Sequence, residues 1–400
     1  MGSATAPSTD RPIEELRALL ASRPAEERLL AAAARIHLDG AARERVELLL
    51  AEPLDWERLV SRAEGHRVAP LVYRTLSLPP FAPQVPAGAL SRLHAAYLLN
   101  GISTLLWQRE LRRVVDGLAT EGIAAVLLKG AALLHTVYPD PALRQLRDLD
   151  LLVQREDRAA AERVLLSLGY LPAEEEWPAG KWPPEWYEKK YRLRDGGGRA
   201  AVVEIHWGLA RKRAPFHVDV AEMLQHSEAI PVDGVEGRVL SPIHQVIHLC
   251  THMAYNDGFG VGLSRLSDLH ELVERHRDRL DWEALAREAG RLRAALCLRY
   301  SLAVAAALFG TELPPDLIES PGGKPLRPAL AAAALERVLA NDEDPAPLPS
   351  TLAKLVSTDR TSLGSLLQLL MPRPRHLRHS YRLLEPVRLI RALRYVRSIR

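Results

Sequence analysis

Two aspartates alternate with leucine inside a mostly apolar run, and this pattern constrains the fold more than any other feature of the chain. The run extends from Leu146 to Val153, with Asp148 and Asp150 on either side of Leu149. Successive side chains of a strand point to opposite faces, so the two aspartates share one face. Two carboxylates about 7 Å apart repel each other unless a cation lies between them, and oxygen ligands suit Mg²⁺. The pattern therefore predicts a buried strand with a metal site on one face.

A short apolar run upstream ends at Lys129 and Gly130, and residues of helical composition follow. This order predicts a strand, a tight glycine junction and the N-terminus of a helix. Such a junction presents backbone N–H groups to an anion, and Lys129 adds a full positive charge. Arg144 and Arg147 bring two guanidinium groups close to the acidic strand. We therefore expect a phosphate cradle at Lys129 and Gly130, with Arg144 nearby.

A third carboxylate stands on another predicted strand, residues 200–207. Alternation places Glu204 and His206 on one face of this strand and Ile205 on the other. Glu204 can therefore join the two aspartates as a metal ligand. We group His206, its neighbour on the same face, with the nucleotide-binding residues.

Together these segments resemble the uncharacterised nucleotidyltransferase-like proteins of bacteria, a branch of the DNA polymerase β-type nucleotidyltransferase superfamily. The resemblance covers roughly residues 25 to 310 and implies that Asp148 and Asp150 bind two Mg²⁺ ions. It also implies that Glu204 is the third carboxylate, which ligates the catalytic metal and accepts the proton of the acceptor. The matching pieces occur in order and are Leu-Leu-Lys-Gly at 127–130, the Arg144 loop, Asp-Leu-Asp-Leu-Leu-Val at 148–153, Leu-Gly-Tyr at 168–170 and Val-Glu-Ile-His-Trp at 203–207.

The reaction implied by the resemblance is transfer of NMP from a nucleoside triphosphate, such as ATP, to a hydroxyl group. The hydroxyl attacks the α-phosphate, pyrophosphate leaves, and two metal ions stabilise the attacking and leaving oxygens. The sequence leaves the acceptor open: a small molecule, a peptide, a protein or a tRNA end. One departure concerns the phosphates, because the wider superfamily has Gly-Ser close before its acidic pair, whereas Ala131 follows Gly130 here. Phosphate contacts are therefore expected from Lys129, backbone amides or Arg144.

Two other functions are compatible with these residues. The first is a non-catalytic nucleotide- or RNA-binding module with a nucleotidyltransferase-like fold. The second, which the pattern favours less, is a glycosyltransferase, because such enzymes also use Asp-x-Asp with a metal. The Lys-Gly pair and Glu204 are not part of that pattern.

Periodicity predicts an α+β protein in which a mixed-sheet core is flanked by N-terminal and C-terminal helical regions, and the resemblance implies that this core has the nucleotidyltransferase fold. A chain of 400 residues, 47% of them hydrophobic, is long enough to bury cores of this kind. A long helix is expected over 87–120, and Ser241 is expected to cap another helix that begins at Pro242. The expected divisions are a helical N-terminal region (1–120), the α/β core (121–240), a helical C-terminal domain (241–370) and a basic amphipathic tail (371–400).

The chain shows no pattern of secretion or membrane insertion. Its first twelve residues lack a basic and then apolar secretory pattern, and no apolar run approaches the ~20 residues that a membrane span needs. Cys250 and Cys297 are too few for a disulfide framework. We expect a cytoplasmic protein with no transmembrane segment.

Three histidines, His244, His248 and His252, follow a helical i, i+4, i+8 spacing, and Asp257 and Asp268 come after them. Such spacing could bind a transition metal, as in phosphohydrolases of the histidine–aspartate type. The adjacent His-Asp pair that defines that class is absent, however. The better interpretation is that this helix face lines the nucleotide cleft.

Two further segments have compositions that point to binding. Tryptophan and tyrosine gather in 174–191, where they can stack on a base or, as we favour, pack as a lid on the sheet. The tail 371–400 has nine arginines and one acidic residue, which leaves the rest of the chain at a net charge of −5. Its arginines form one face of a predicted amphipathic helix that can bind RNA, an anionic membrane surface or an acidic partner, or dock on the C-terminal domain.

Overall fold

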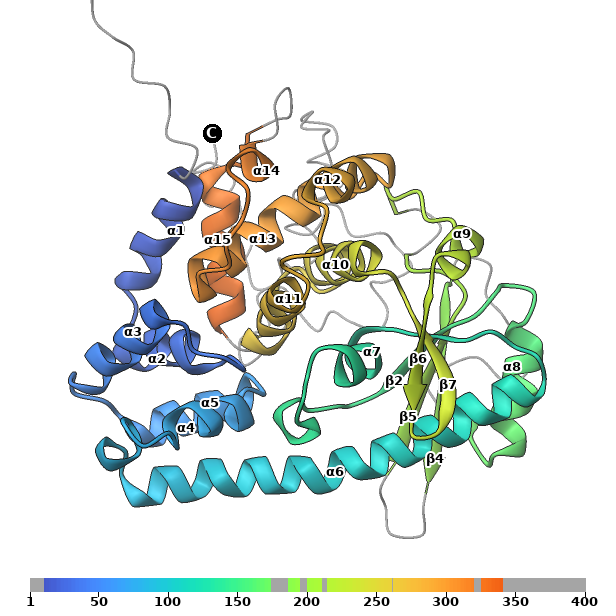
Figure 1. Cartoon of the computed structure of the whole chain (residues 1–400), viewed down its shortest axis with the longest axis horizontal. Coiled ribbons are helices and arrows are strands. Elements are labelled where there is room, and N and C mark those ends of the chain that lie inside the picture. The colour runs from blue at the N-terminus through green and yellow to red at the C-terminus, as the bar shows by residue number, and fades with distance from the viewer. Residues whose placement is uncertain are drawn as a thin grey trace, which may run out of the picture.

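A mixed β-sheet lies at one side of the molecule, and helices from both ends of the chain lie beside it (Figure 1). This is the α+β architecture that the sequence predicts. The computed structural model describes residues 11–173, 186–194, 200–210, 214–260, 262–319 and 325–340.

The sheet has seven strands in the order β3-β4-β5-β2-β1-β7-β6. Two pairings, β2 with β5 and β1 with β7, are parallel, and the other four are antiparallel. The strands are β1 (Val126–Leu127), β2 (Leu149–Leu152), β3 (Leu171–Pro172), β4 (Glu188–Arg194), β5 (Ala200–His206), β6 (Glu228–Val232) and β7 (Val235–Val239).

The parallel pairing of β2 with β5 decides which side chains share a face. Asp150 lies directly opposite Glu204, and Leu152 lies opposite His206. Because side chains alternate along each strand, these residues point to one face of the sheet. That face therefore carries the polar residues of both central strands.

Two helices cover the opposite, apolar face of the sheet. Leu151 and Ile205 are fully buried there, in one hydrophobic cluster with residues of α6 (Ala87–Thr120) and α8 (Arg158–Ser167). The expected helix over 87–120 is confirmed. In Figure 1, α6 runs along one edge of the molecule, from the N-terminal helices to the sheet.

The N-terminal and C-terminal helices share a second hydrophobic cluster, into which Leu152 also projects from the sheet. Its centre is α13, which is buried almost all round, and α1 and α2 pack directly against it. The N-terminal helices are α1 (Arg11–Ala21), α2 (Ala25–Ala33), α3 (Gly40–Leu50), α4 (Trp56–Gly65) and α5 (Ala69–Leu76). The C-terminal helices are α10 (Pro242–Thr251), α11 (Leu263–Arg275), α12 (Trp282–Arg291), α13 (Ala295–Phe309), α14 (Pro315–Glu319) and α15 (Pro328–Ala340).

Several local expectations can be compared with the structure. Ser241 caps α10 by accepting a hydrogen bond from the backbone N–H of His244, and Pro242 is the first helical residue, as predicted. The basic tail 371–400 and most of the aromatic segment, residues 174–185, lie outside the described residues. Among the residues that the structure describes, no helix is long and apolar enough to cross a membrane.

The apolar face of β5 provides a test of the core. Ile205→Ala removes a fully buried side chain, so we expect it to lower the free energy of unfolding by about 2–5 kcal/mol. Leu171→Ala on β3 is the matched control, because Leu171 is 65% exposed and its truncation should change stability by no more than about 0.5 kcal/mol. Urea denaturation measures both, and equal losses would contradict this assignment of the core.

Candidate functional site

The junction between β1 and α7 (Lys129–Thr136) places a buried lysine against the acidic strand. Lys129 Nζ donates a hydrogen bond to Asp150 Oδ1 at 2.8 Å, and the lysine side chain is 5% exposed. Lys129 has a φ of +45°, a left-handed conformation that is costly for a residue with a Cβ. The sequence predicted a tight junction at Gly130, but the strained backbone lies one residue earlier, at Lys129. The strained residue is the one that forms the buried ion pair with Asp150.

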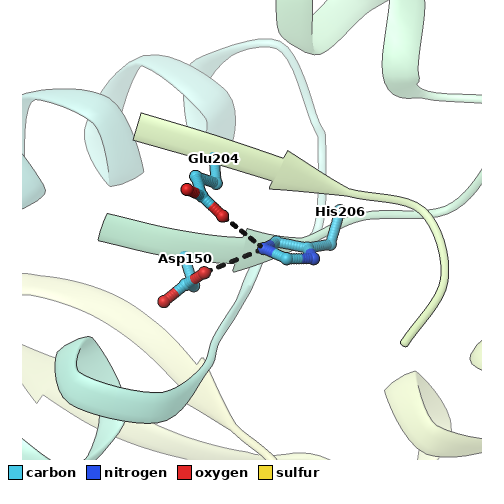
Figure 2. Close-up of side chains that lie close together, drawn as sticks. All are labelled: Asp150, Glu204 and His206. Carbon is cyan, nitrogen blue, oxygen red and sulfur yellow. Dashed lines mark hydrogen bonds and ion pairs between the residues drawn. The ribbon is translucent and has the colours of Figure 1, made fainter. Parts of the chain in front are cut away.

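His206 joins two carboxylates on the polar face of the sheet. Figure 2 shows Asp150 and Glu204 pointing toward the same ring nitrogen, Nε2, which lies 2.9 Å from Asp150 Oδ1 and 3.7 Å from Glu204 Oε2. All three residues are buried, and each offers a ligand atom within 4.8 Å of the others. Among the described residues, they form the one group of three that could hold a metal ion.

Strand β4 contributes two further charges to this face. Lys190 Nζ lies 2.6 Å from Glu204 Oε1, and Lys190 is partly exposed. Glu188 Oε2 lies 3.3 Å from the other ring nitrogen of His206, without hydrogen-bond geometry. Asp150 and Glu204 therefore each have an ammonium group within hydrogen-bond distance.

These contacts determine the protonation of the cluster. Burial disfavours the charged form of Asp150, but the charges of Lys129 and His206 outweigh it and hold the pKa of Asp150 well below its usual value. Burial, and then the charge of Asp150, raise the pKa of Glu204. Burial lowers the pKa of His206, but the hydrogen bond with Asp150 and the charge of Glu188 raise it more. The cluster is therefore built around an ionised Asp150.

Asp148, the other predicted metal ligand, precedes β2 and is half-buried. It is not in the group of three, and it lines a neighbouring pocket together with Gly130. This pocket lies where the N-terminal helices, the core and α11 meet. Its basic lining consists of Arg67, Arg144, Arg147 and Arg265.

Arg144 connects this pocket to the C-terminal helices. Its Nε and Nη2 donate to the two carboxylate oxygens of Asp268 on α11, at 3.0 and 2.8 Å, and Asp268 also accepts a hydrogen bond from Tyr138. A Cβ at Gly130 would collide with the Arg144 guanidinium group and with Leu146. The role of Gly130 is therefore to let Arg144 pass close to the start of α7.

Arg147 and Arg265 differ from Arg144 in their contacts. Arg147 is exposed and Arg265 is half-buried. Within the described part of the chain, neither guanidinium group makes a hydrogen bond or ion pair to another residue. Because a guanidinium group binds phosphate oxygens in pairs, these two side chains are the most available anion ligands of the pocket.

The outer members of the predicted histidine series have partners of their own. His244 Nε2 lies 3.1 Å from Glu288 Oε1, and His252 Nδ1 lies 2.8 Å from Asp257 Oδ2. His252 begins a π-helical turn, η3 (His252–Asn256), that follows α10. Neither histidine belongs to a possible metal group among the described residues.

His248 lies beside the candidate site. It lines a small cavity with Lys129, and neither ring nitrogen has a hydrogen-bond partner in the described structure. Burial, and then the charge of Lys129, hold the pKa of His248 well below its usual value. His248 is therefore a neutral imidazole on the Lys129 side of the cluster.

Sequence reasoning identified Asp150, Glu204 and His206 but missed Glu188 and Lys190. The signal for β4 was weak, because the strand opens with three consecutive charged residues and only Tyr191 and Leu193 mark its apolar face. The pairing of Lys190 with Glu204 across β4 and β5 appears only once the antiparallel register is known. Arg67, from the α4–α5 connection, and Arg265, from α11, had no local pattern that linked them to this site.

Comparison with known proteins gives a family and two similar structures. Residues 52–310 match the model of a family described as uncharacterised nucleotidyltransferase. An antigenic nucleotidyltransferase-like protein from Paracoccidioides brasiliensis has 14% identity and a TM-score of 0.30, covering 56% of this chain and 95% of that chain. JHP933 from Helicobacter pylori has 17% identity and a TM-score of 0.32, covering 67% and 97%. A search of curated proteins finds no match.

The contribution of the buried Lys129 to stability can be compared with that of the partly exposed Lys190. Lys129→Met leaves Asp150 without its ammonium partner, so we expect the free energy of unfolding to fall by about 3–5 kcal/mol. Lys190→Met is the matched control, since this side chain is 38% exposed and its pair should contribute no more than about 1 kcal/mol. Denaturant titrations in EDTA measure both. The double variant Lys129→Met/Asp150→Leu should recover stability relative to Lys129→Met, and failure to do so would contradict the role of the pair.

The close approach at Gly130 provides a second test. Gly130→Ala should push the Arg144 guanidinium group away from Asp268 and weaken nucleotide binding by about tenfold, the loss expected when one charged hydrogen-bonded contact is disturbed. Gly88→Ala in α6 is the control, because an added Cβ there meets no atom within 4 Å. Isothermal titration with Mg²⁺ and each nucleoside triphosphate measures the effect. Equal affinity in the two variants would contradict the steric argument.

Proposed function

Because the chain belongs to the uncharacterised nucleotidyltransferase family, we propose that it transfers NMP from a nucleoside triphosphate to a hydroxyl of an acceptor, in a reaction that depends on Mg²⁺. The observation that carries this proposal is the register of β2 and β5. It sets Asp150 beside Glu204, with His206 between them, next to a pocket lined by arginines. Metal-binding carboxylates and phosphate-binding groups are the parts that phosphoryl transfer requires.

The donor set fits a divalent cation. Asp150 and Glu204 offer carboxylate oxygens, the preferred ligands of Mg²⁺, and His206 adds an imidazole nitrogen. The hydrogen bonds and ion pairs that the described residues make with the Asp150 side chain use Oδ1, which leaves Oδ2 for a cation. Lys190 is partly exposed and can move from Glu204 to solvent. In this proposal Asp150 and Glu204 would hold the metal, and Asp148 at the pocket edge would be a further carboxylate ligand.

The arginine pocket suits the triphosphate. Arg147 and Arg265 bind its oxygens in this proposal, while Arg144 is held in position by Asp268. Gly130 is part of the same lining, so the start of α7 also faces the phosphates. The pocket adjoins the acidic cluster through Asp148.

The proposed reaction is an in-line displacement. A bond forms between the acceptor oxygen and the α-phosphorus, the bond to the β-phosphate oxygen breaks, and pyrophosphate leaves. The metal, when bound, supplies charge neutralisation of the phosphate oxygens. The proton of the acceptor hydroxyl passes to a carboxylate, and Glu204 is the candidate. We assign the reaction to the cytoplasm, because Cys250 and Cys297 are both free thiols.

One observation favours a second candidate function. The ion pairs of Lys129 with Asp150 and of Lys190 with Glu204 neutralise both carboxylates without a metal. A chain of this kind can bind a nucleotide or RNA without catalysing transfer. In that case binding would survive loss of the carboxylates and would weaken steeply with salt.

A label-transfer assay distinguishes the two candidates. The purified protein is mixed with Mg²⁺, each α-³²P-labelled triphosphate and total cell extract, and labelled acceptors are detected. We expect transfer by the wild type and a loss of about 10²-fold to 10³-fold in Glu204→Gln, the range seen when one charge-stabilising group is removed. Glu236→Gln, on the exposed side of β7, should retain full activity. Absence of transfer, with equal triphosphate binding by wild type and Glu204→Gln, would establish the binding module.

A further inference from the structure

The middle of α6 exposes its large apolar side chains to solvent. Five of the seven exposed large hydrophobic residues of the described chain lie within nine consecutive positions of this helix. We call them the leucine stripe; they are Leu98, Leu99, Ile102, Leu105 and Leu106, each 43–66% exposed. They lie at positions i, i+1, i+4, i+7 and i+8 of the helix, so they form one continuous face. Monomeric proteins rarely expose a patch of this kind.

The inner face of the same helix segment is polar. Asn100 and Thr104 are buried, and Asn100 Nδ2 donates to the Ala142 carbonyl oxygen at 2.6 Å. Thr104 Oγ1 and Asn100 Oδ1 have no hydrogen-bond partner in the described structure. An amphipathic helix normally buries its leucines and exposes such residues, and this segment does the reverse. The leucine stripe is therefore suited to a contact outside the described fold.

Figure 1 shows that no other labelled element covers the outer side of α6 between the N-terminal helices and the sheet. The helix has 34 residues, a length of about 50 Å at 1.5 Å per residue, so a partner helix can lie along it for several turns. A straight helix face with its apolar residues at the centre is the simplest surface for a two-fold contact, in which the same patch is used by both subunits.

Charges on the two sides of the stripe specify its partner. Toward the N-terminus, Arg92 is paired with both Glu57 and Glu64, which leaves an acidic excess, and Glu57 is 83% exposed. Toward the C-terminus, Arg109 and Arg112 are exposed on the same face as the stripe. In an antiparallel pair of α6 helices centred on Ile102, Arg112 of one copy lies opposite Arg92 and its two glutamates in the other. A parallel pair would instead bring the arginines of both copies together, which is unfavourable.

We infer that the leucine stripe of α6 is the interface of a homodimer, in which the α6 helices of two copies of this chain pack antiparallel around a two-fold axis near Ile102. The stripe forms the apolar centre of the interface, and the pairs between Glu57 and Arg112 of opposite copies form its charged rim. The candidate site faces away from this contact, since it lies on the other face of the sheet from α6.

The oligomeric state of the full chain tests the inference. Sedimentation equilibrium should show a dimer for the wild type, and Ile102→Glu should raise the dimer dissociation constant by about 100-fold or more, because it buries an unpaired charge at the centre. Leu48→Glu on α3 is the matched control, since Leu48 is also 65% exposed but lies outside the stripe, and it should leave the dimer intact. A monomeric wild type, or a dimer that Ile102→Glu leaves unchanged, overturns the inference.

Charge exchange tests the antiparallel direction. Arg112→Glu and Glu57→Arg should each weaken the dimer by about 5-fold to 10-fold, and the double variant should restore it. Ile102→Cys should also cross-link to itself with a short bismaleimide, whereas Ser91→Cys, about 17 Å away along the helix, should not. The native thiols do not interfere because Cys250 and Cys297 are buried. If Ile102→Cys and Ser91→Cys both cross-link to themselves, the pair is parallel and the arrangement is overturned. If the protein is a monomer and Ile102→Cys does not react with the maleimide, the chain itself covers the stripe and the dimer is overturned.

Discussion

The buried ion pair between Lys129 and Asp150 is the interaction on which the rest of the site depends. Parallel pairing of β2 with β5 forces Asp150 and Glu204 side by side on a face that is shielded from water. Two ionised carboxylates in such a position are unstable unless cations compensate them. Lys129 provides the buried cation, and its left-handed backbone shows that the β1–α7 junction is shaped to deliver it. The strain at Lys129 is therefore tolerated because the fold needs this charge at this place.

Three parts of the chain are held together by the loop that precedes β2. Arg144 in this loop pairs with Asp268 of α11, which links the sheet to the C-terminal helices. On the other side, Tyr97 of α6 donates to Asp140, and Asn100 donates to the carbonyl oxygen of Ala142. The loop is thus fixed by polar contacts on both sides. Tyr97 and Asn100 thus occupy the inward side of α6 at this point, while the leucine stripe lies on its outer face.

The sequence predicted the elements whose pattern is local. The long helix at 87–120, the Ser241 cap and the shared face of Glu204 and His206 all follow from spacing alone, and the structure confirms them. The resemblance to a nucleotidyltransferase family, drawn from short ordered motifs, is confirmed by the family match over 52–310. Contacts between distant segments were not predictable in this way. Lys190 meets Glu204 only through a strand register, and Arg265 reaches the pocket only through the packing of α11.

The proposed function requires phosphate contacts in a chain that has Ala131 after Gly130. Ala131 has no hydroxyl to offer, and the Lys129 ammonium group is directed to Asp150 and away from solvent. The junction of β1 and α7 can therefore offer little more than backbone N–H groups as ligands for an anion. The charged groups that line the pocket come instead from the loop before β2, from the α4–α5 connection and from α11. Nucleotide affinity in this chain should consequently depend on the docking of the helical regions against the core, because without α11 the pocket would lose Arg265 and the partner that orients Arg144.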